Sequence, residues 1–465
     1  MGSEGRVVVV SNRAPSIFAR PSAEERRALP VGGLVSSLRP FLEASGGIWM
    51  GWDGKPDGQE GAAPAKITEV EGIKLASVSL SRDEVGGFYD DFSNQTLWPL
   101  LHGFPRKTVI NYDSYGVYRT VNWKYADALI DLLRPDDLVW VHDYHLIPLG
   151  SELRRLGWTG RLGFFLHIPF PPAEIFGILP WARQLLTCLF DYDLVGLQTR
   201  RYVRNLQESL GDELGAALIG DTVHHQDRTL RARSFPVGAD VEAFREMALS
   251  QVPTPVSRFL EDFPKDRQLL IGVDRLDYTK GIIHRMQAIE RLLENYPEMV
   301  GRVTLVQISA PSRINIPEYA EEREQVDSLA GRINGRFGEA DWMPIHPLHR
   351  SHSQQDLTHL YQEADACLVT PLRDGMNLVA KEFIASQTSD PGVLVLSRFC
   401  GAAESMREAL MINPYDFQGT ASTIHRALTM PRSERQRRWE ALFTDVSGHT
   451  ARDWSYSFIA ALGDS

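Results

Sequence analysis

The apolar residues of this chain fall into short runs, and the stretches between the runs repeat apolar residues with helical spacing. Short continuous runs are typical of strands that a parallel sheet buries on both faces. The runs are Val7–Val10, Leu138–Val141, Leu162–Leu166, Leu194–Leu197, Leu269–Val273, Val303–Ile308, Cys367–Thr370 and Val393–Leu396. Helical spacing is clearest at Ile282–Tyr296 and Gln354–Glu363. This alternation predicts doubly wound α/β domains.

The alternation occurs twice, which indicates two domains of similar size. A chain of 465 residues is also too long for a single hydrophobic core. At Phe235–Gly238 a proline and a glycine end a strand and predict a hinge. We therefore expect two Rossmann-like domains, residues 1–237 and 238–449, that face a central cleft. Ligands of open α/β sheets bind beyond the carboxyl ends of the strands, so the residues directly after strands are the most informative.

The composition excludes several classes of partner. The formal net charge of -11 argues against nucleic acid, and any anionic substrate must be held by a local basic cluster. Every apolar run is far shorter than the roughly 18 residues of a membrane helix, so we expect no membrane partner. The three cysteines form no CxxC pair, which is typical of a reducing compartment. We expect a cytoplasmic protein with small-molecule substrates, and homo-oligomer formation stays open.

The clearest cationic candidates follow the run Leu269–Val273. Arg275 and Lys280 leave the same strand end, where a diphosphate could meet a fork of donors and a mobile point charge. The alternative is a surface ion pair of these cations with Asp274 or Asp277.

A second group of polar residues follows the run Cys367–Thr370. Backbone N–H groups of residues 375–378 begin a helix and would suit an anion. Asp374 could accept from sugar hydroxyls, and Glu382, about two turns along the helix, could hold a ribose diol. The alternatives are a helix cap for Asp374 and an exposed helical carboxylate for Glu382.

The N-terminal half offers matching features. Arg13 follows the first strand, and Gly32-Gly33 precedes a helical stretch where backbone can approach a phosphate. His142–His145 and His167 each follow a strand, although a histidine there is more often structural. The aromatic segment Tyr89–Trp98 suits a sugar-binding wall, and its alternative is core packing.

Two motifs resemble metal sites. Asp191-Tyr192-Asp193 matches a DxD pattern but precedes a strand, which predicts that its carboxylates lie at the start of that strand. His142, Asp143 and His145 lack a further ligand cluster that would complete a zinc site. We expect no metal and no cofactor, with any nucleotide-sugar acting as a substrate.

Together these motifs resemble the trehalose-6-phosphate synthases, which are retaining glycosyltransferases of the two-domain GT-B fold. The resemblance covers nearly the whole chain in the same order. Its motifs are Val9–Arg13, Gly32–Leu34, Phe92–Asn94, Leu97–Pro99, Trp140–Leu146, Phe164–Pro171, Arg275–Gly281, Ala310–Arg313, Ala330–Gly335 and Arg373–Glu382.

The resemblance implies a role for each matching residue. In the donor site, Arg275 and Lys280 would clamp the diphosphate and Glu382 the ribose. Asp374 and His167 would bind hydroxyls of the transferred glucose. The remaining donor-site residues would be Gly33, in a loop closing over the donor, and Gly375, Met376, Asn377 and Leu378. In the acceptor site, Arg13, Tyr89 and Arg313 would hold the phosphate of glucose 6-phosphate, and Asp143, Trp52 and Trp98 would line its sugar.

The resemblance also implies a mechanism. Glucose would pass from a nucleoside-diphosphate glucose to glucose 6-phosphate by a metal-independent front-face displacement, in which the leaving phosphate deprotonates the acceptor hydroxyl. A last helix, about 450–465, would cross back onto the first domain. The charged segment Arg20–Leu29 could be a loop that orders on binding. His346–Arg350 lies near the region expected to meet the base, without indicating whether the donor is UDP-, GDP- or ADP-glucose.

Two alternatives belong to other classes. One is a pseudo-glycosyltransferase that couples cyclitols, which should lack the residues that bind the donor sugar. The other is a non-catalytic sensor of sugar phosphates. The presence of Asp374–Asn377 and His167 argues against the first. The presence of Arg275, Lys280, Asp374 and Glu382 argues against the second.

Overall fold

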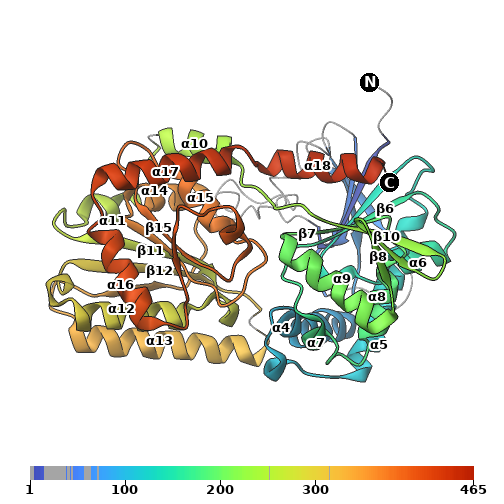
Figure 1. Ribbon diagram of the computed structural model, residues 1–465, viewed down its shortest axis with the longest axis horizontal. Coiled ribbons are helices and arrows are strands. Elements are labelled where there is room, and N and C mark those ends of the chain that lie inside the picture. The colour runs from blue at the N-terminus through green and yellow to red at the C-terminus, as the bar shows by residue number, and fades with distance from the viewer. Residues whose placement is uncertain are drawn as a thin grey trace. The chain divides into compact units, whose positions relative to one another are not determined.

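The computed structural model describes residues 5–14, 38, 42, 46–56, 64–70, 73–250, 252–313 and 315–464. These residues form two compact units. Unit 1 contains the described residues up to Pro236 together with 451–464, and unit 2 contains those of 237–450. Figure 1 labels the strands and helices of each unit.

Unit 2 is built on a parallel sheet with the strand order β13-β12-β11-β14-β15-β16. Its strands are β11 (Gln268–Arg275), β12 (Val303–Ala310), β13 (Ile345–Leu348), β14 (Ala366–Val369), β15 (Val393–Ser397) and β16 (Leu410–Ile412). The strand order reverses between β11 and β14, which makes the loops after these two strands the expected ligand site.

Helices cover both faces of this sheet, as its near-continuous apolar strands require. One face packs on α12 (Ile282–Asn295), α13 (Pro317–Phe337) and α16 (Phe417–Leu428). The other packs on α10 (Val241–Leu249), α14 (Gln354–Glu363), α15 (Leu378–Ser386) and α17 (Arg432–Ser447). Figure 1 shows these two helical layers on opposite sides of the sheet.

Unit 1 has a larger sheet with the order β3-β4-β2-β1-β5-β6-β7-β10-β9-β8. Its strands are β1 (Val7–Arg13), β2 (Ile48–Trp52), β3 (Lys66–Val70), β4 (Ile73–Val78), β5 (Leu138–His142), β6 (Arg161–Leu166), β7 (Leu194–Leu197), β8 (Ala217–Ile219), β9 (Thr222–His225) and β10 (Arg228–Ser234). The strand order reverses between β1 and β5. The antiparallel strands β3, β8 and β9 lie at the two edges of the sheet.

The predicted strands are all present, and the fold class is confirmed. The sequence analysis missed β2, β3, β4, β13, β16 and the ribbon β8–β10. It also missed a π-helical segment, η2 (Val85–Leu97), which contains most of the aromatic stretch read as a sugar-binding wall. Phe92 and Leu97 of this stretch are fully buried, so that part of it is core.

The C-terminal helix α18 (Ala451–Gly463) packs on β5, β6 and β7 of unit 1 (Figure 1). The ring of Phe458 stacks on Trp140 with centroids 4.4 Å apart. A Cβ at Gly163 or Gly196 would lie within 2.8 Å of the Phe458 ring, so glycine is required at both positions for the helix to approach. Aromatic packing therefore attaches the end of the chain to unit 1.

We predict that Phe458→Ala lowers the free energy of unfolding by about 3–5 kcal/mol, because it leaves a cavity between α18 and two glycine-bearing strands. Urea denaturation followed by circular dichroism measures this change. Tyr456→Ala on the same helix is the matched control, since Tyr456 is 44% exposed, and should cost less than about 1 kcal/mol. Equal losses in the two variants would contradict the packing argument.

Candidate active site

In unit 2 the candidate donor residues gather at the reversal of strand order. Arg275 is the last residue of β11, and Lys280 ends the short helix η5 (Tyr278–Lys280) that follows it. Gly281 then turns into α12 with φ of +64°, and a Cβ there would lie 2.3 Å from the Thr370 carbonyl oxygen. The loops after β11 and β14 are thus in direct contact.

Lys280 is paired with Asp374, 94 residues away in sequence. The Lys280 Nζ donates to Asp374 Oδ2 over 2.5 Å, and Asn377 Nδ2 donates to the same oxygen over 3.1 Å. Asp374 is therefore not the cap of α15, whose N-cap residue is Asn377 with φ of +75°. Within the described part of the chain no side chain caps α15, which leaves the N–H groups of its first turn available to an anion.

Asp277 is the counter-charge of this cluster, and the sequence analysis gave it no role beyond a surface pair. Its side chain is fully buried, and its Oδ1 accepts from the Thr279 N–H at 3.0 Å. Its Oδ2 accepts from Arg313 at 3.3 Å. Burial alone would raise the pKa of Asp277, but the charges of Arg313, Arg275 and Lys280 bring that pKa below its ordinary value. Three candidate phosphate ligands thus surround one carboxylate.

Arg313 belongs to this unit 2 cluster. It has φ of +48° and donates to the Tyr319 hydroxyl as well as to Asp277. The sequence analysis grouped Arg313 with Arg13 and Tyr89, which are residues of unit 1. Its proposed contact with the acceptor phosphate stays a prediction.

Glu382 lies one turn into α15 rather than the two turns expected, because the helix begins at Leu378. Its side chain is half-buried. Burial raises the pKa of Glu382 to about 7, so the carboxylate changes charge within the physiological range. A raised pKa of this kind is common at ligand sites. Gly33, the remaining predicted donor residue, lies outside the described residues, as does Arg20–Leu29.

In unit 1 the candidate acceptor residues include an aromatic clamp on a cation. Arg13 ends β1, and its guanidinium carbon lies 4.8 Å from the ring centre of Trp52 and 5.9 Å from that of Tyr89. The rings of Trp52 and Tyr89 are themselves 6.4 Å apart. Cation–π contacts hold a guanidinium in place without neutralising it, so Arg13 in this clamp can still attract an anion.

Trp98 and Asp143 follow in the same unit. Trp98 is only 3% exposed, and its ring packs on His102 and Tyr144 with centroids 4.1 and 5.7 Å apart. Asp143, directly after β5, has φ of +73° and accepts from the backbone N–H of His167 over 3.2 Å. A positive φ at a residue other than glycine strains the backbone, and such strain at a strand end is typical of functional loops.

His167, directly after β6, is held in its neutral form. Burial lowers the pKa of His167 to about 3. Its Nε2 lies 3.0 Å from Nδ1 of His142, a contact that the sequence analysis missed. The available signal was that both histidines follow neighbouring strands.

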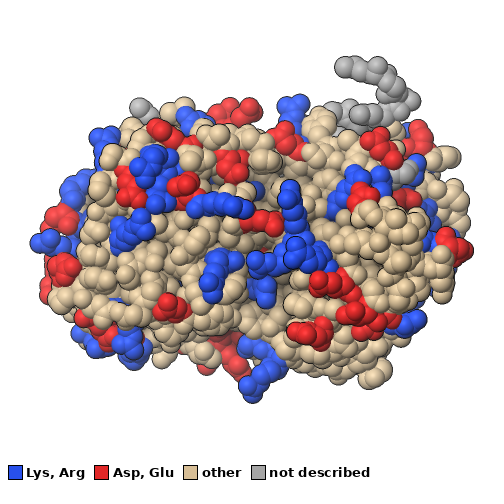
Figure 2. Space-filling model, viewed as in Figure 1, with Lys and Arg blue, Asp and Glu red and all other residues tan. Residues whose placement is uncertain are grey.

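Other candidate sites are weaker. Asp191 and Asp193 pair with Arg228 and Arg154 at the start of β7, as predicted. Within the described ranges no three His, Cys, Asp or Glu side chains are grouped for a metal ion. No helix of those ranges is both long and apolar enough to cross a membrane. On the face drawn in Figure 2, acidic and basic side chains are interspersed, so cationic character is local.

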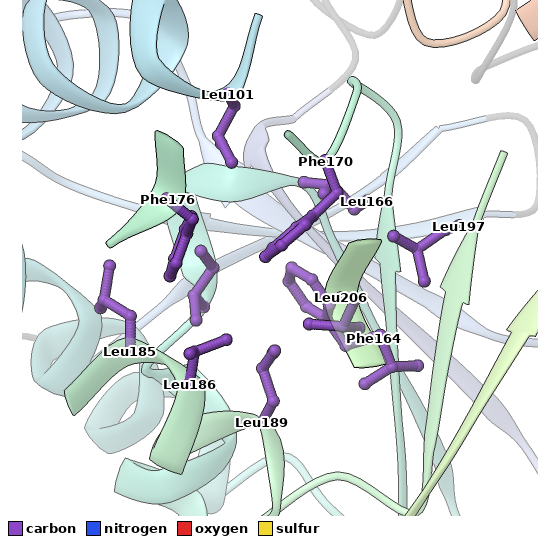
Figure 3. A pocket seen from close by; sticks show the side chains of 12 residues that line it. Leu101, Phe164, Leu166, Phe170, Phe176, Leu185, Leu186, Leu189, Leu197 and Leu206 are labelled. Atoms are coloured by element: carbon purple, nitrogen blue, oxygen red, sulfur yellow. The ribbon is translucent and has the colours of Figure 1, made fainter. Parts of the chain in front are cut away.

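Two cavities lie apart from these residues. Figure 3 shows one in unit 1, about 20 Å³ in volume, lined only by apolar side chains such as Phe164 and Leu189. It has no polar group to orient a substrate and belongs to the core. A cavity of about 120 Å³ in unit 2 is lined by Phe259, His346 and Arg350, among others.

Known proteins resemble the chain over its whole length. Residues 5–464 match the model of glycosyltransferase family 20. A trehalose-6-phosphate synthase of Sinorhizobium fredii is 40% identical over 460 residues, 98% of each chain. The UDP-forming α,α-trehalose-phosphate synthase of Burkholderia xenovorans, solved in complex with glucose 6-phosphate, is 38% identical with a TM-score of 0.92, covering 99% of this chain and 100% of that one. A solved E. coli structure bound with UDP-2-fluoro glucose is 37% identical with a TM-score of 0.92, covering 98% and 99%.

Two Rossmann-like units, each with its candidate groups where the strand order reverses, define a glycosyltransferase of the GT-B fold. The chain belongs to glycosyltransferase family 20. The resemblance to trehalose-6-phosphate synthases is thereby confirmed.

We predict a pH dependence from Glu382. If its ionised carboxylate accepts from the donor ribose, kcat/KM for the donor, measured with saturating acceptor, should rise as pH increases through about 7 and level off above it. Glu382→Gln should show a lower value without that inflection, because its amide does not titrate. An inflection that survives unchanged in the Gln variant would reassign it to another group.

Proposed function

We propose that this chain transfers glucose from UDP-glucose to glucose 6-phosphate, with retention of configuration, and so forms trehalose 6-phosphate. The proposal rests on one observation: each unit has a cationic group at the point where the strand order of its sheet reverses. One surrounds Asp277 in unit 2, and the other is Arg13 in its aromatic clamp in unit 1. A reaction between a nucleoside-diphosphate sugar and a sugar phosphate requires two such groups. The names of similar proteins support UDP as the nucleotide.

The donor would bind in unit 2. Arg275 and Lys280 would hold the diphosphate, with backbone N–H groups at the start of α15, and Glu382 would hold the ribose. The Lys280 Nζ lies 2.5 Å from Asp374 Oδ2. A bound diphosphate would share Lys280 and leave Asp374 able to accept from a glucose hydroxyl. Gly33 and the segment around it would close over the donor.

The acceptor would present its phosphate to Arg13, Tyr89 and Arg313. Its sugar would lie against Trp52 and Asp143, and the buried Trp98 would support that wall from below. These assignments rest on the charge of the two arginines and on the aromatic faces beside Arg13.

The chemistry follows from charge. As the glycosidic bond to the diphosphate breaks, negative charge grows on the leaving group, and Arg275 and Lys280 would stabilise it. The leaving phosphate oxygen would take the proton of the attacking hydroxyl on the same face of the sugar, so no side chain is needed as a base. These cations would perform the task that a metal ion performs in other enzymes. Independence from metal and a cytoplasmic location both stay predictions.

The proposal is tested by nucleotide release from the purified protein. We expect UDP release from UDP-glucose that requires glucose 6-phosphate and persists with EDTA, with slower release from GDP- and ADP-glucose. NMR of the product should show a 1,1-linked disaccharide phosphate with both anomeric centres α. Absence of release with all three donors would refute the proposal and favour cyclitol coupling or a sensor, and loss of release with EDTA would refute metal independence alone.

Arginine variants should show which substrate each arginine binds. Arg275→Ala should lower kcat/KM for the donor by about 100- to 1000-fold, the usual effect of removing a donor to developing negative charge. Arg13→Ala should mainly raise KM for glucose 6-phosphate. Arg302→Ala is the control, because Arg302 is exposed at the opposite end of the unit 2 sheet, just before β12. Near-normal turnover of the Arg275→Ala variant would refute the assignment of Arg275 to the donor site.

A further inference from the structure

His142 is a buried titratable residue for which the mechanism above has no use. It is the last residue of β5, and its neighbour across the parallel β5–β6 pair is Phe165. Its side chain is 1% exposed. Its Nδ1 lies 3.0 Å from Nε2 of His167, and the two rings are stacked at 25° with centroids 5.2 Å apart.

Both imidazoles of this pair are neutral in the folded protein. Burial lowers the pKa of His142 well below its ordinary value, and the neighbouring His167 lowers it further. Burial also lowers the pKa of His167, to about 3. Two neutral rings in hydrogen-bond contact share one proton between the facing nitrogens, so one ring donates and the other accepts.

The surroundings of His142 decide which ring donates. Its other nitrogen, Nε2, is buried and has no hydrogen-bond partner among the described residues. The indole N–H groups of Trp140 and Trp454 are also buried and also have no hydrogen-bond partner among the described residues. Their rings lie 4.6 and 6.3 Å from the His142 ring. These indoles can donate but cannot accept, so a proton on Nε2 of His142 would add a third unsatisfied donor to the same place.

We propose that His142 is a positioning residue that donates from Nδ1 to Nε2 of His167 and thereby selects the tautomer in which His167 carries its proton on Nδ1. His167 then offers an N–H donor to its ligand. This inference rests on the proposed function, in which that ligand is a hydroxyl oxygen of the transferred glucose.

Other contacts hold the rest of His167 in place. Its backbone N–H donates to Asp143, and its carbonyl accepts from Gln198 Nε2 over 3.3 Å. Its ring packs against Phe165 and Trp454 with centroids 4.7 and 5.8 Å away. Packing and the main-chain bonds restrict where the ring lies, and His142 decides which nitrogen bears hydrogen. A ring in the other tautomer would meet the same hydroxyl oxygen with a lone pair.

The decisive measurement is the tautomer itself. Protonated and unprotonated imidazole nitrogens differ widely in 15N chemical shift, and the chain has 13 histidines to label. His167 is assigned by comparison with His167→Asn. We expect His167 of the wild-type protein to be protonated at Nδ1 and unprotonated at Nε2. The opposite tautomer would overturn the inference, whether or not any variant folds.

Two isosteric variants test the consequence for turnover. His142→Asn can present its amide N–H where Nδ1 lies, so kcat/KM for UDP-glucose should stay within about 10-fold of wild type. His142→Asp presents only an acceptor and should draw the proton to Nε2 of His167, with a fall of about 100-fold or more, as expected for a wrong tautomer. KM for glucose 6-phosphate should be unchanged in both. Equal activity of the two variants, each with a wild-type circular dichroism spectrum, would contradict the positioning role.

Failure of this inference is distinguishable from failure of the proposed function. The 15N measurement needs no turnover, so the expected tautomer in a protein that releases no UDP would leave His142 as assigned and refute the function. UDP release that depends on glucose 6-phosphate, in a protein whose His167 is protonated at Nε2, would support the proposed function and refute the role assigned to His142.

Discussion

The buried carboxylate of Asp277 is the interaction on which the candidate donor site of unit 2 depends. Arg313 donates to this carboxylate, and the charges of Arg275 and Lys280 also lower its pKa, so Asp277 offsets the mutual repulsion of three cations. Asp277 also caps η5, so a single side chain sets both the path of the loop and the direction of its charges.

In unit 1 the cation Arg13 is held in a different way from the cations of unit 2, as expected if the two units bind different substrates. Arg13 lies over the aromatic faces of Trp52 and Tyr89, whereas the cations of unit 2 lie around a carboxylate. His167, half-buried directly after β6, is neutral because burial lowers its pKa to about 3. In the proposed function, the charged Arg13 would recognise a phosphate and the neutral His167 a sugar hydroxyl.

Much of the architecture was predictable because buried parallel strands leave a strong sequence signal. The strands that were missed lack it: β2 is tryptophan-rich, β16 has three residues, and β8 is fully exposed at the sheet edge. The position of Glu382 was misjudged by one turn because α15 starts at Leu378 after the unusual backbone of Asn377. Individual roles came from resemblance to a family, and periodicity alone would have left each candidate beside a structural alternative.

The sequence by itself determined the fold class and the family to which the chain belongs, and it predicted that the chemistry lies after strand ends. Each of these depends on local order along the chain: apolar runs, turns and contiguous motifs. Only the tertiary structure decided the pairs: Lys280 with Asp374, Arg313 with Asp277, and His142 with His167. The physical reason is that such contacts depend on which strands become neighbours in the sheet, and a hydrophobic pattern specifies that a strand is buried without specifying what lies beside it.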